Sequence, residues 1–537
     1  MNRRSFSTAR GLRPFTAGHR SGPSEGADSV NGMAAAAEIS DVPTPTGRQT
    51  ALVAVSQAMV LALGAVIALL VAQFFGKDAE TDAFFAAYGF YGVGMTFAQT
   101  FRLTTVSSIV SSGPETITRL LGAVGLLCVV LAAPMVVLAD PLGRVLVESD
   151  PTNIAPLTLR MLWVALSGQL IAAILATVLA VRGRFTEIGV GTLVASVVSV
   201  VVFAAMQSFL GVPAAALGLV VSALFLLAVF AIVLWRSGER LARPSHALHG
   251  IAHEAGRLGF AGVTFFGTTV GYVICISVSA RLGAGQATVF AYGYMLAAVL
   301  VGVTANVSAM VRSPALVASA DRAREIAGAA LWSFRFALVL IGPVLGFAVL
   351  LGPPVIGAVL GADFGASDVD QMITTLLALI PWVLGSAAGV FAVVELLARG
   401  ELRRLALLTA AQMLLLVPLT LGARTIGAGL EGIAGGFSIV MAGGALVQLH
   451  WAFPRAWSMT VAAMGRALGR EVAVVAAAFV PSAVLLRALG DAAAVTAGAS
   501  LLAAVLAVGA SYVAWPREVG ALLAIVGRGP GAATADG

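Results

Sequence analysis

The stretch FFGKDAETDAFF, residues 74–85, joins two long apolar segments through a short polar turn. The first segment ends at Phe75-Gly76, and the second opens with Thr81-Asp82-Ala83-Phe84-Phe85. A similar junction, RLGAGQATVFAY at residues 281–292, follows 207 residues later and again places a glycine turn before small and aromatic residues. We infer that the chain contains two related halves, each with such a junction.

Apolar segments continue outward from both junctions along most of the chain. The 537 residues are 59% hydrophobic and only 11% charged, whereas soluble domains carry about 25% charged residues. So little polar surface requires a bilayer to cover the protein. Most segments have the roughly 20 residues that a membrane-crossing helix needs, and most lack the alternation of strands. We predict an all-α integral membrane protein with fourteen spans, at 50–74, 80–110, 118–139, 156–181, 185–210, 212–235, 258–282, 286–311, 326–350, 371–398, 402–423, 428–452, 470–488 and 492–514.

Basic residues alternate between the loops that connect these spans. One set of loops and tails carries 24 of the 32 lysines and arginines, and the opposite set carries five. The three others, Arg102, Arg160 and Arg335, lie within spans. Because cytoplasmic loops are enriched in basic residues, the alternation predicts that both termini are cytoplasmic.

The longest basic loop divides the spans into two sets of six, with a pair left over. Six is even, so the two sets share an orientation and are related by a pseudo-two-fold axis along the membrane normal. We predict two six-helix lobes followed by a C-terminal helix pair. The expected boundaries are 1–48 for a disordered cytoplasmic tail, 49–235 for the N-lobe, 236–257 for a cytoplasmic linker, 258–453 for the C-lobe, 454–514 for the terminal pair and 515–537 for a second disordered cytoplasmic tail.

The N-terminal tail allows other readings. Residues 1–20 contain five arginines and no acid, which also resembles a transit peptide, and Met33 is an alternative start.

The run Thr81-Asp82-Ala83-Phe84-Phe85 after Gly76 resembles the start of the second helix in the MurJ (MviN) lipid II flippases of the MOP exporter superfamily. Tyr292, Gly302-Val303 and Pro314 provide a looser match in the eighth span. At the level of architecture the resemblance covers residues 50–514. It implies a flippase for a polyprenyl-diphosphate glycan, a peptidoglycan precursor or a related cell-envelope polysaccharide unit, that works by alternating access in the plasma membrane of a bacterium.

Several positions depart from that family. The arginine–aspartate pair of its first helix would fall on Ile67 and Ala68, and the proline and arginines of its second helix fall on Tyr91 to Thr96. Its charged residues in the eighth helix are replaced by Gly293-Tyr294-Met295-Leu296. In the family these arginines line the central cavity. Their replacement leaves two alternatives beside the flippase, a MATE-like exporter of small molecules and a non-transporting relative that acts as a scaffold for envelope synthesis.

Charged and polar side chains within spans are the candidate functional residues, because burying them in lipid is costly. The predicted cavity residues are Arg102, Gln99, Asn306 and Arg160, and the arginines alternatively extend to lipid headgroups. Glu395 is a candidate for ion coupling, or it forms an i,i+4 ion pair with Arg399. Asp82 either takes part in transport or stabilises the first turn of its own helix. Gly76, Thr81, Asp82, Phe84 and Phe85 form the structural motif.

Other chemistry has little support. Cys128 and Cys275 lie in apolar segments and are expected to pack as small hydrophobic residues. His246, His249 and His253 share one face of a helix but have no acidic or cysteine partner at ligand spacing. Phosphate-binding, zinc and nucleophile motifs are missing from the sequence. We therefore expect a monomeric transporter and not an enzyme, without cofactor, metal or nucleic acid, whose partners are a lipid-linked glycan, membrane lipids and cell-envelope synthesis proteins.

Overall fold

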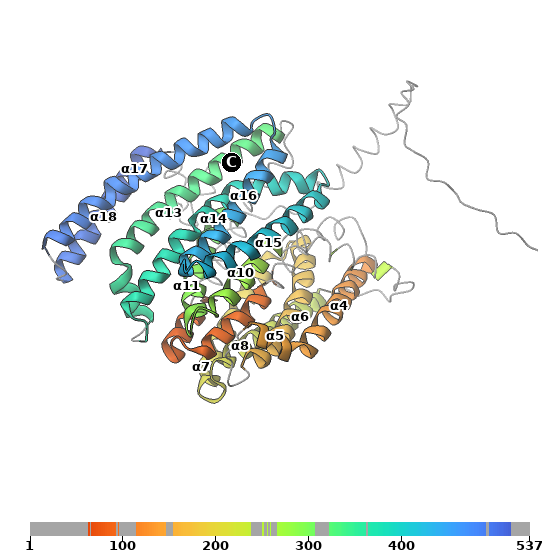
Figure 1. The fold of residues 1–537 in the computed structure, drawn as a ribbon. Coiled ribbons are helices and arrows are strands. Elements are labelled where there is room, and N and C mark those ends of the chain that lie inside the picture. Colours follow the sequence, from red (N-terminus) through yellow and green to blue (C-terminus); the bar gives the residue numbers. More distant parts are fainter. Residues whose placement is uncertain are drawn as a thin grey trace, which may run out of the picture. The chain divides into compact units, whose positions relative to one another are not determined.

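The structure, a computed structural model, is α-helical in nearly all the residues that it describes (Figure 1). All of these residues belong to one compact unit, residues 44–537. They are 63–64, 66–92, 95, 114–146, 154–237, 250–251, 255, 258, 266–306, 322–360, 363–489 and 493–516.

Nine helices within these ranges are long and apolar enough to cross a membrane. Four shorter apolar helices, among them Val66–Phe75 and Gly498–Ala514, coincide with further predicted spans. The second predicted span, 80–110, is described as a helix over residues 79–92. The prediction of an all-α integral membrane fold is confirmed, and the total of fourteen spans stays a prediction.

The N-lobe is organised around one buried helix. Residues along most of α6 are buried, because α4, α7 and α8 pack on it and the short α5 covers one end. The lobe contains the helix Val66–Phe75, the helix over residues 79–92, α4 (Pro114–Val137), α5 (Ala139–Leu146), α6 (Ile154–Val181), α7 (Phe185–Leu210) and α8 (Pro213–Arg236).

The C-lobe repeats this packing. Helix α14 contacts α13, α15 and α16, as α6 contacts α4, α7 and α8. In both lobes the last two helices, α7 with α8 and α15 with α16, also pack against each other. The lobe contains α10 (Phe266–Ser279), α11 (Gln286–Val301) with the π-helical turn η1 (Gly302–Asn306), α13 (Arg322–Leu360), α14 (Ala366–Ala398), α15 (Leu402–Thr425) and α16 (Gly429–Ala452).

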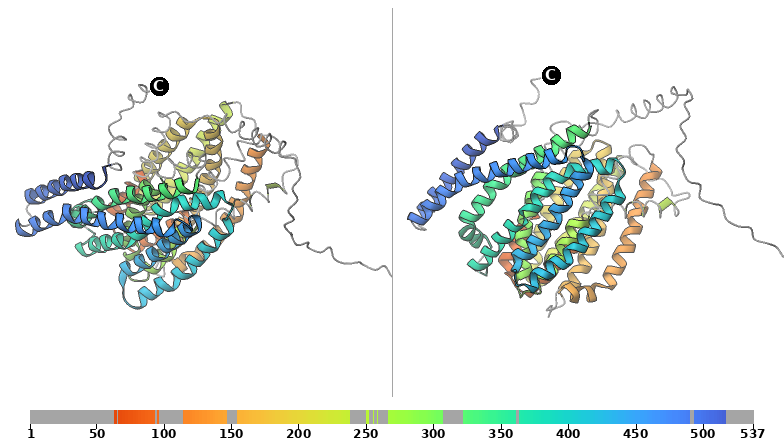
Figure 2. Two further views of the ribbon diagram at one scale, coloured as in Figure 1. Left: turned by 90° about the horizontal axis from the view of Figure 1, so that it is seen from above. Right: turned by 45° about the horizontal axis from the view of Figure 1, so that its top comes forward.

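Within the described residues, the terminal pair packs mainly on α13. Helices α17 (Trp457–Leu489) and α18 (Ala493–Ala514) lie against each other and against α13. Figure 1 and both views of Figure 2 show them side by side with α13. Their outward faces expose large apolar side chains that suit contact with lipid: Val472, Val480, Val484, Leu501, Val505 and Val508.

Three helices differ from the predicted spans. Helix α17 begins 13 residues before the predicted start at 470, and α13 extends ten residues beyond the predicted end at 350. Helix α5 was not predicted. These extensions contain prolines, glycines or charged residues, which lower the hydropathy by which spans are recognised but do not prevent a helix that packs on its neighbours.

Candidate functional site

The two lobes meet where the helix over residues 79–92 approaches α10 and α11. A methyl group added at Gly89 would lie 2.9 Å from a ring carbon of Tyr272, and one at Gly92 would lie 3.2 Å from the Thr269 methyl. Small residues allow membrane helices to approach this closely. These glycines therefore let the second helix of the N-lobe lie close against α10, the first helix of the C-lobe.

Asp82 joins the lobes at this contact. Its Oδ2 accepts a hydrogen bond from the Gly285 backbone N–H at 2.7 Å. Its Oδ1 accepts bonds from the backbone N–H and the hydroxyl of Thr288, each at 2.7 Å. Because Gly285 and Thr288 flank the first turn of α11, the carboxylate supplies the cap that this helix terminus needs.

This finding gives Asp82 a contact that the sequence did not indicate. The predicted stabilisation of its own helix by Asp82 stays a prediction, and at the start of that helix the Asp78 Oδ1 accepts the backbone N–H groups of Glu80 and Thr81 at 3.0 and 2.9 Å. Asp82, only 2% exposed, caps a helix of the opposite lobe.

Equivalent residues of the two halves contact each other around this cap. The Thr288 hydroxyl lies 3.1 Å from the Thr81 hydroxyl, and these two residues are 207 positions apart, the separation of the sequence repeat. The rings of Phe85 and Tyr292, also 207 apart, meet edge to face at 5.3 Å. Residues that contact their own equivalents lie at the pseudo-two-fold axis, so the junction motifs form the interface between the lobes.

Two further contacts close the same end of the bundle. Lys77 forms an ion pair with Asp368 in the first turn of α14. Gly76 has a φ of +65°, and a methyl group there would lie 2.5 Å from an Asp363 carboxylate oxygen. We call Lys77, Thr81, Asp82, Gly285, Thr288 and Asp368 the inter-lobe latch.

Aromatic side chains from both lobes extend inward from the latch. Tyr272 and Tyr294 pack with ring centroids 4.3 Å apart, and Tyr294 stacks on Trp382 at 5.0 Å. Tyr88 and Tyr91 of the N-lobe pair at 5.7 Å. Phe84 stacks on Tyr88. This aromatic cluster lies where the family resemblance leads one to expect cavity arginines, and it contains no charged side chain.

Tyr292→Phe is expected to weaken the lobe interface by about 1 kcal/mol, because the Tyr292 hydroxyl donates a buried hydrogen bond to the Ala68 carbonyl at 2.8 Å. Thermal unfolding of the purified protein would measure the loss. The matched control is Tyr294→Phe, since this hydroxyl donates no hydrogen bond within the described ranges. Equal melting temperatures for the two variants would contradict the expectation.

The other predicted residues do not gather at the latch. Arg160 binds both oxygens of Asp140 on α5 at 3.0 Å, and both side chains are about half exposed. Glu395, 5% exposed, accepts a 2.7 Å hydrogen bond from Arg399. The structure thus contains the i,i+4 ion pair that was one of the two alternatives for Glu395, and a role in ion coupling stays a prediction.

Several predicted residues cannot be placed. Gln99, Arg102 and the three histidines at 246, 249 and 253 lie outside the described residues. Asn306 ends the turn η1, which continues α11, but its side chain lies outside the described set. No group of metal-ligating side chains occurs in the described part of the chain. The cavity roles of these residues remain predictions.

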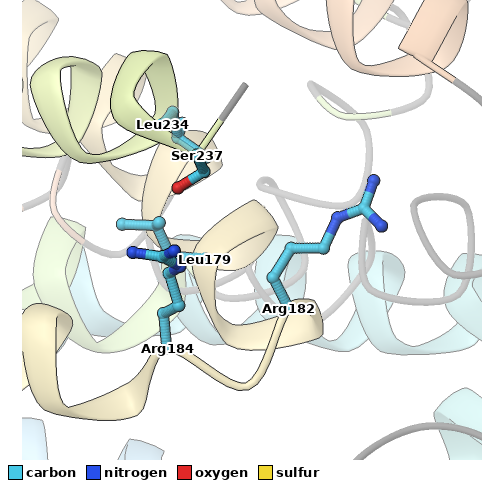
Figure 3. A pocket seen from close by; sticks show the side chains of 5 residues that line it. All are labelled: Leu179, Arg182, Arg184, Leu234 and Ser237. Carbon is cyan, nitrogen blue, oxygen red and sulfur yellow. The ribbon is translucent and has the colours of Figure 1, made fainter. Parts of the chain in front are cut away.

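A small pocket lies at the other end of the N-lobe, between the ends of α6 and α8. Its volume is about 190 Å³, and it is lined by Leu179, Arg182, Arg184, Leu234 and Ser237. Figure 3 shows the Arg184 guanidinium beside Leu179, whereas that of Arg182 points away from both. Arg184 also pairs with Glu187 at 3.3 Å, and the Ser237 hydroxyl bonds the Val233 carbonyl. Arg184 and Ser237 therefore have hydrogen-bond partners within the protein itself, and these contacts do not require a ligand in the pocket.

The fold of the two helical lobes, which meet through a capped helix and an aromatic contact, is similar to that of solved membrane transporters. One of them is the structure of the lipid II flippase MurJ in an inward closed conformation. The TM-score is 0.69 at 15% identity, over 87% of this chain and 99% of that one.

Two structures of multidrug resistance MATE transporters of the MOP superfamily are also similar. The outward-facing one has a TM-score of 0.54 over 78% of this chain and 96% of its own, and the inward-facing one 0.52 over 75% and 99%, both at 15% identity. No protein-family model and no curated protein sequence matches the chain.

Proposed function

We propose that this protein is a flippase that moves a lipid-linked glycan across the plasma membrane by alternating access. The observation that carries the proposal is the inter-lobe latch, in which the Asp82 carboxylate of one lobe caps a helix of the other. Three buried hydrogen bonds hold this end closed, and they must break for the lobes to separate. The MurJ-like fold supports a polyprenyl-diphosphate glycan as the cargo.

The alternation of basic loops supports an orientation for the latch. The loops at residues 76–78 and 283–285 belong to the set of loops that holds only five of the 32 basic residues, so they are assigned to the outer face and both termini to the cytoplasm. In the latched state the path is closed on the outer side. Cargo would enter from the cytoplasm, and breaking the latch would expose it to the outside.

The head group would occupy the space between the lobes while the polyprenyl chain stays in lipid. Arg102 is the residue that we assign to the diphosphate, because a guanidinium group donates two parallel hydrogen bonds to an oxyanion. Gln99 and Asn306 are assigned to the sugars, as amide groups that donate and accept.

Flipping of a fluorescent polyprenyl-diphosphate glycan in proteoliposomes tests this function. We expect protein-dependent movement for the wild type and at least a tenfold slower rate for Arg102→Ala, through loss of the charge-assisted contact. The exposed Arg403, on α15, offers Arg403→Ala as a control that keeps the rate. Failure of the wild-type protein to move any glycan lipid would overturn the proposal.

A MATE-like exporter of organic cations is the second candidate. The charge-free aromatic cluster of Tyr88, Tyr91, Tyr272, Tyr294 and Trp382 favours it, because aromatic faces attract organic cations. Uptake of tetraphenylphosphonium by the same proteoliposomes separates the candidates. Cation uptake without glycan movement supports the exporter, and absence of both supports the non-transporting scaffold.

A further inference from the structure

Four polar or charged side chains meet where the terminal pair joins the C-lobe. Trp515, directly after α18, donates its indole N–H to Oε2 of Glu471 on α17 at 2.6 Å. The Arg470 and Arg335 guanidinium carbons lie 5.0 and 5.9 Å from the Trp515 ring centroid. We call Arg335, Arg470, Glu471 and Trp515 the terminal cluster. It connects three helices, α13, α17 and α18.

The cluster lies at the edge of the hydrocarbon. Helix α18 has 22 residues, which is about 33 Å and enough to cross the bilayer once. Trp515 follows its end and therefore lies at an interface, where tryptophan is enriched in membrane proteins. Helices α13 and α17 each begin 13 residues before Arg335 and Arg470, so both extend about 20 Å past this level. The basic-loop alternation assigns this interface to the cytoplasmic side.

Within the cluster one oxygen of the carboxylate is engaged. Glu471 is 3% exposed, and its Oε2 accepts the Trp515 indole N–H. Its Oε1 accepts no hydrogen bond within the described residues and lies directly against α13, where a methyl group at Gly342 would overlap it. Arg470 is exposed and forms no ion pair within the described ranges. Arg466, one turn earlier, is exposed as well, so α17 carries two exposed arginines near this level.

The positive charge of these arginines at the membrane boundary favours the binding of an anion from the bilayer. A guanidinium group at the membrane boundary is stabilised by phosphate oxygens, to which it donates in a bidentate manner. Stacking on Trp515 restricts both guanidinium groups, so less rotational freedom is lost when a phosphate binds. Next to cluster residues in the sequence, Val472, Tyr512 and Val513 are exposed, and Val480 is exposed further along α17, so these side chains provide an apolar surface for acyl chains.

We propose that Arg335, Arg470 and Trp515 form a binding site for the phosphate head group of an anionic phospholipid in the cytoplasmic leaflet. The site is separate from the inter-lobe latch and does not depend on the cargo. A bound lipid would bridge α13 and α17 and so strengthen the attachment of the terminal pair to the C-lobe.

Quenching of Trp515 fluorescence by brominated lipids tests the proposal. The protein is placed in nanodiscs of phosphatidylcholine with one tenth phosphatidylglycerol, with bromine on the chains of either the anionic lipid or an equal fraction of the zwitterionic lipid. The difference between wild type and Trp515→Phe isolates the Trp515 signal. We expect about fivefold enrichment of the anionic lipid at Trp515, the preference that one basic residue near the surface provides.

Arg470→Gln should abolish this preference without unfolding the protein, because Arg470 is exposed. The matched control is Arg403→Gln, which removes an exposed arginine on α15 and should keep the preference. Equal quenching of the wild type by the two brominated lipids overturns the site, and so does an unchanged preference in Arg470→Gln. Free inorganic phosphate at millimolar concentration should not reduce the quenching, and competition by it would identify a soluble anion as the ligand instead.

Discussion

Asp82→Ala is expected to open the latched end of the lobes. The variant removes three hydrogen bonds of 2.7 Å and leaves the Gly285 and Thr288 backbone N–H groups at the start of α11 without their acceptor. Buried donors that lose a charged partner cost about 3 kcal/mol or more, which shifts an equilibrium between closed and open lobes about a hundredfold. The variant should therefore favour the outward-open state and slow flipping, because the closed state is no longer regained efficiently.

Spin labels on the two lobes can measure this opening. Arg144, on the short helix α5, and Ile426, directly after α15, are exposed and belong to segments assigned to the outer face. Labels there, in a background without Cys128 and Cys275, should move apart by several ångströms in Asp82→Ala. Asp82→Asn is the matched control and should show a smaller shift, because its amide retains one acceptor oxygen. Unchanged distances in Asp82→Ala would refute the latch.

Gly346→Leu is expected to displace the terminal pair from the C-lobe. A methyl group at Gly346 would already overlap three ring carbons of Phe479 on α17. This ring is buried and held edge to face by Phe347 at 5.1 Å, so it cannot move aside freely. Overpacking of a buried contact costs about 1–3 kcal/mol, and a leucine adds three carbons beyond the one that already overlaps. We expect α17 to separate from α13 over this stretch.

Reactivity of a cysteine at Ala478 would report the separation. Ala478 is fully buried beside Phe479, so Ala478→Cys should resist maleimide in the otherwise unchanged protein and react readily when Gly346→Leu is added. Gly328→Leu, in the same helix, is the matched control because a methyl group at Gly328 would have no atom within 4 Å. Protection of the cysteine in both variants would show that the pair is not held at Gly346.

Much of the interface could be anticipated from the repeat of 207 residues. The two junction motifs, around Thr81 and Thr288, are the segments that meet in the structure, and a two-fold relation between halves requires that some equivalent residues contact each other. The hydrogen bonds of Asp82 could not be anticipated. Its equivalent is Val289, which offers no carboxylate, so the latch is asymmetric and the repeat alone does not indicate which helix receives the cap.

The contacts of the terminal cluster could not be anticipated from the sequence either. Hydropathy marks 470–488 as a span, yet α17 begins at Trp457, and Met464 and Ala467 in this extension are buried by packing. Glu471 and Trp515 form a hydrogen bond with each other although they are 44 residues apart and belong to different helical segments. The residues around either one in the sequence do not indicate this partner.

By itself the sequence determined the membrane class, most of the spans and the division into two lobes with an added pair. These properties follow from the free energy of transferring apolar residues into lipid. This free energy accumulates over about 20 consecutive residues, so a span can be recognised from a short stretch of sequence. Only the tertiary structure decided which helix Asp82 caps, that Lys77 pairs with Asp368, and that Phe85 of one lobe packs on Tyr292 of the other. Such contacts join residues 200 or more positions apart, or helices brought together by packing, and their energy depends on distances of a few ångströms that exist only after the helices have assembled.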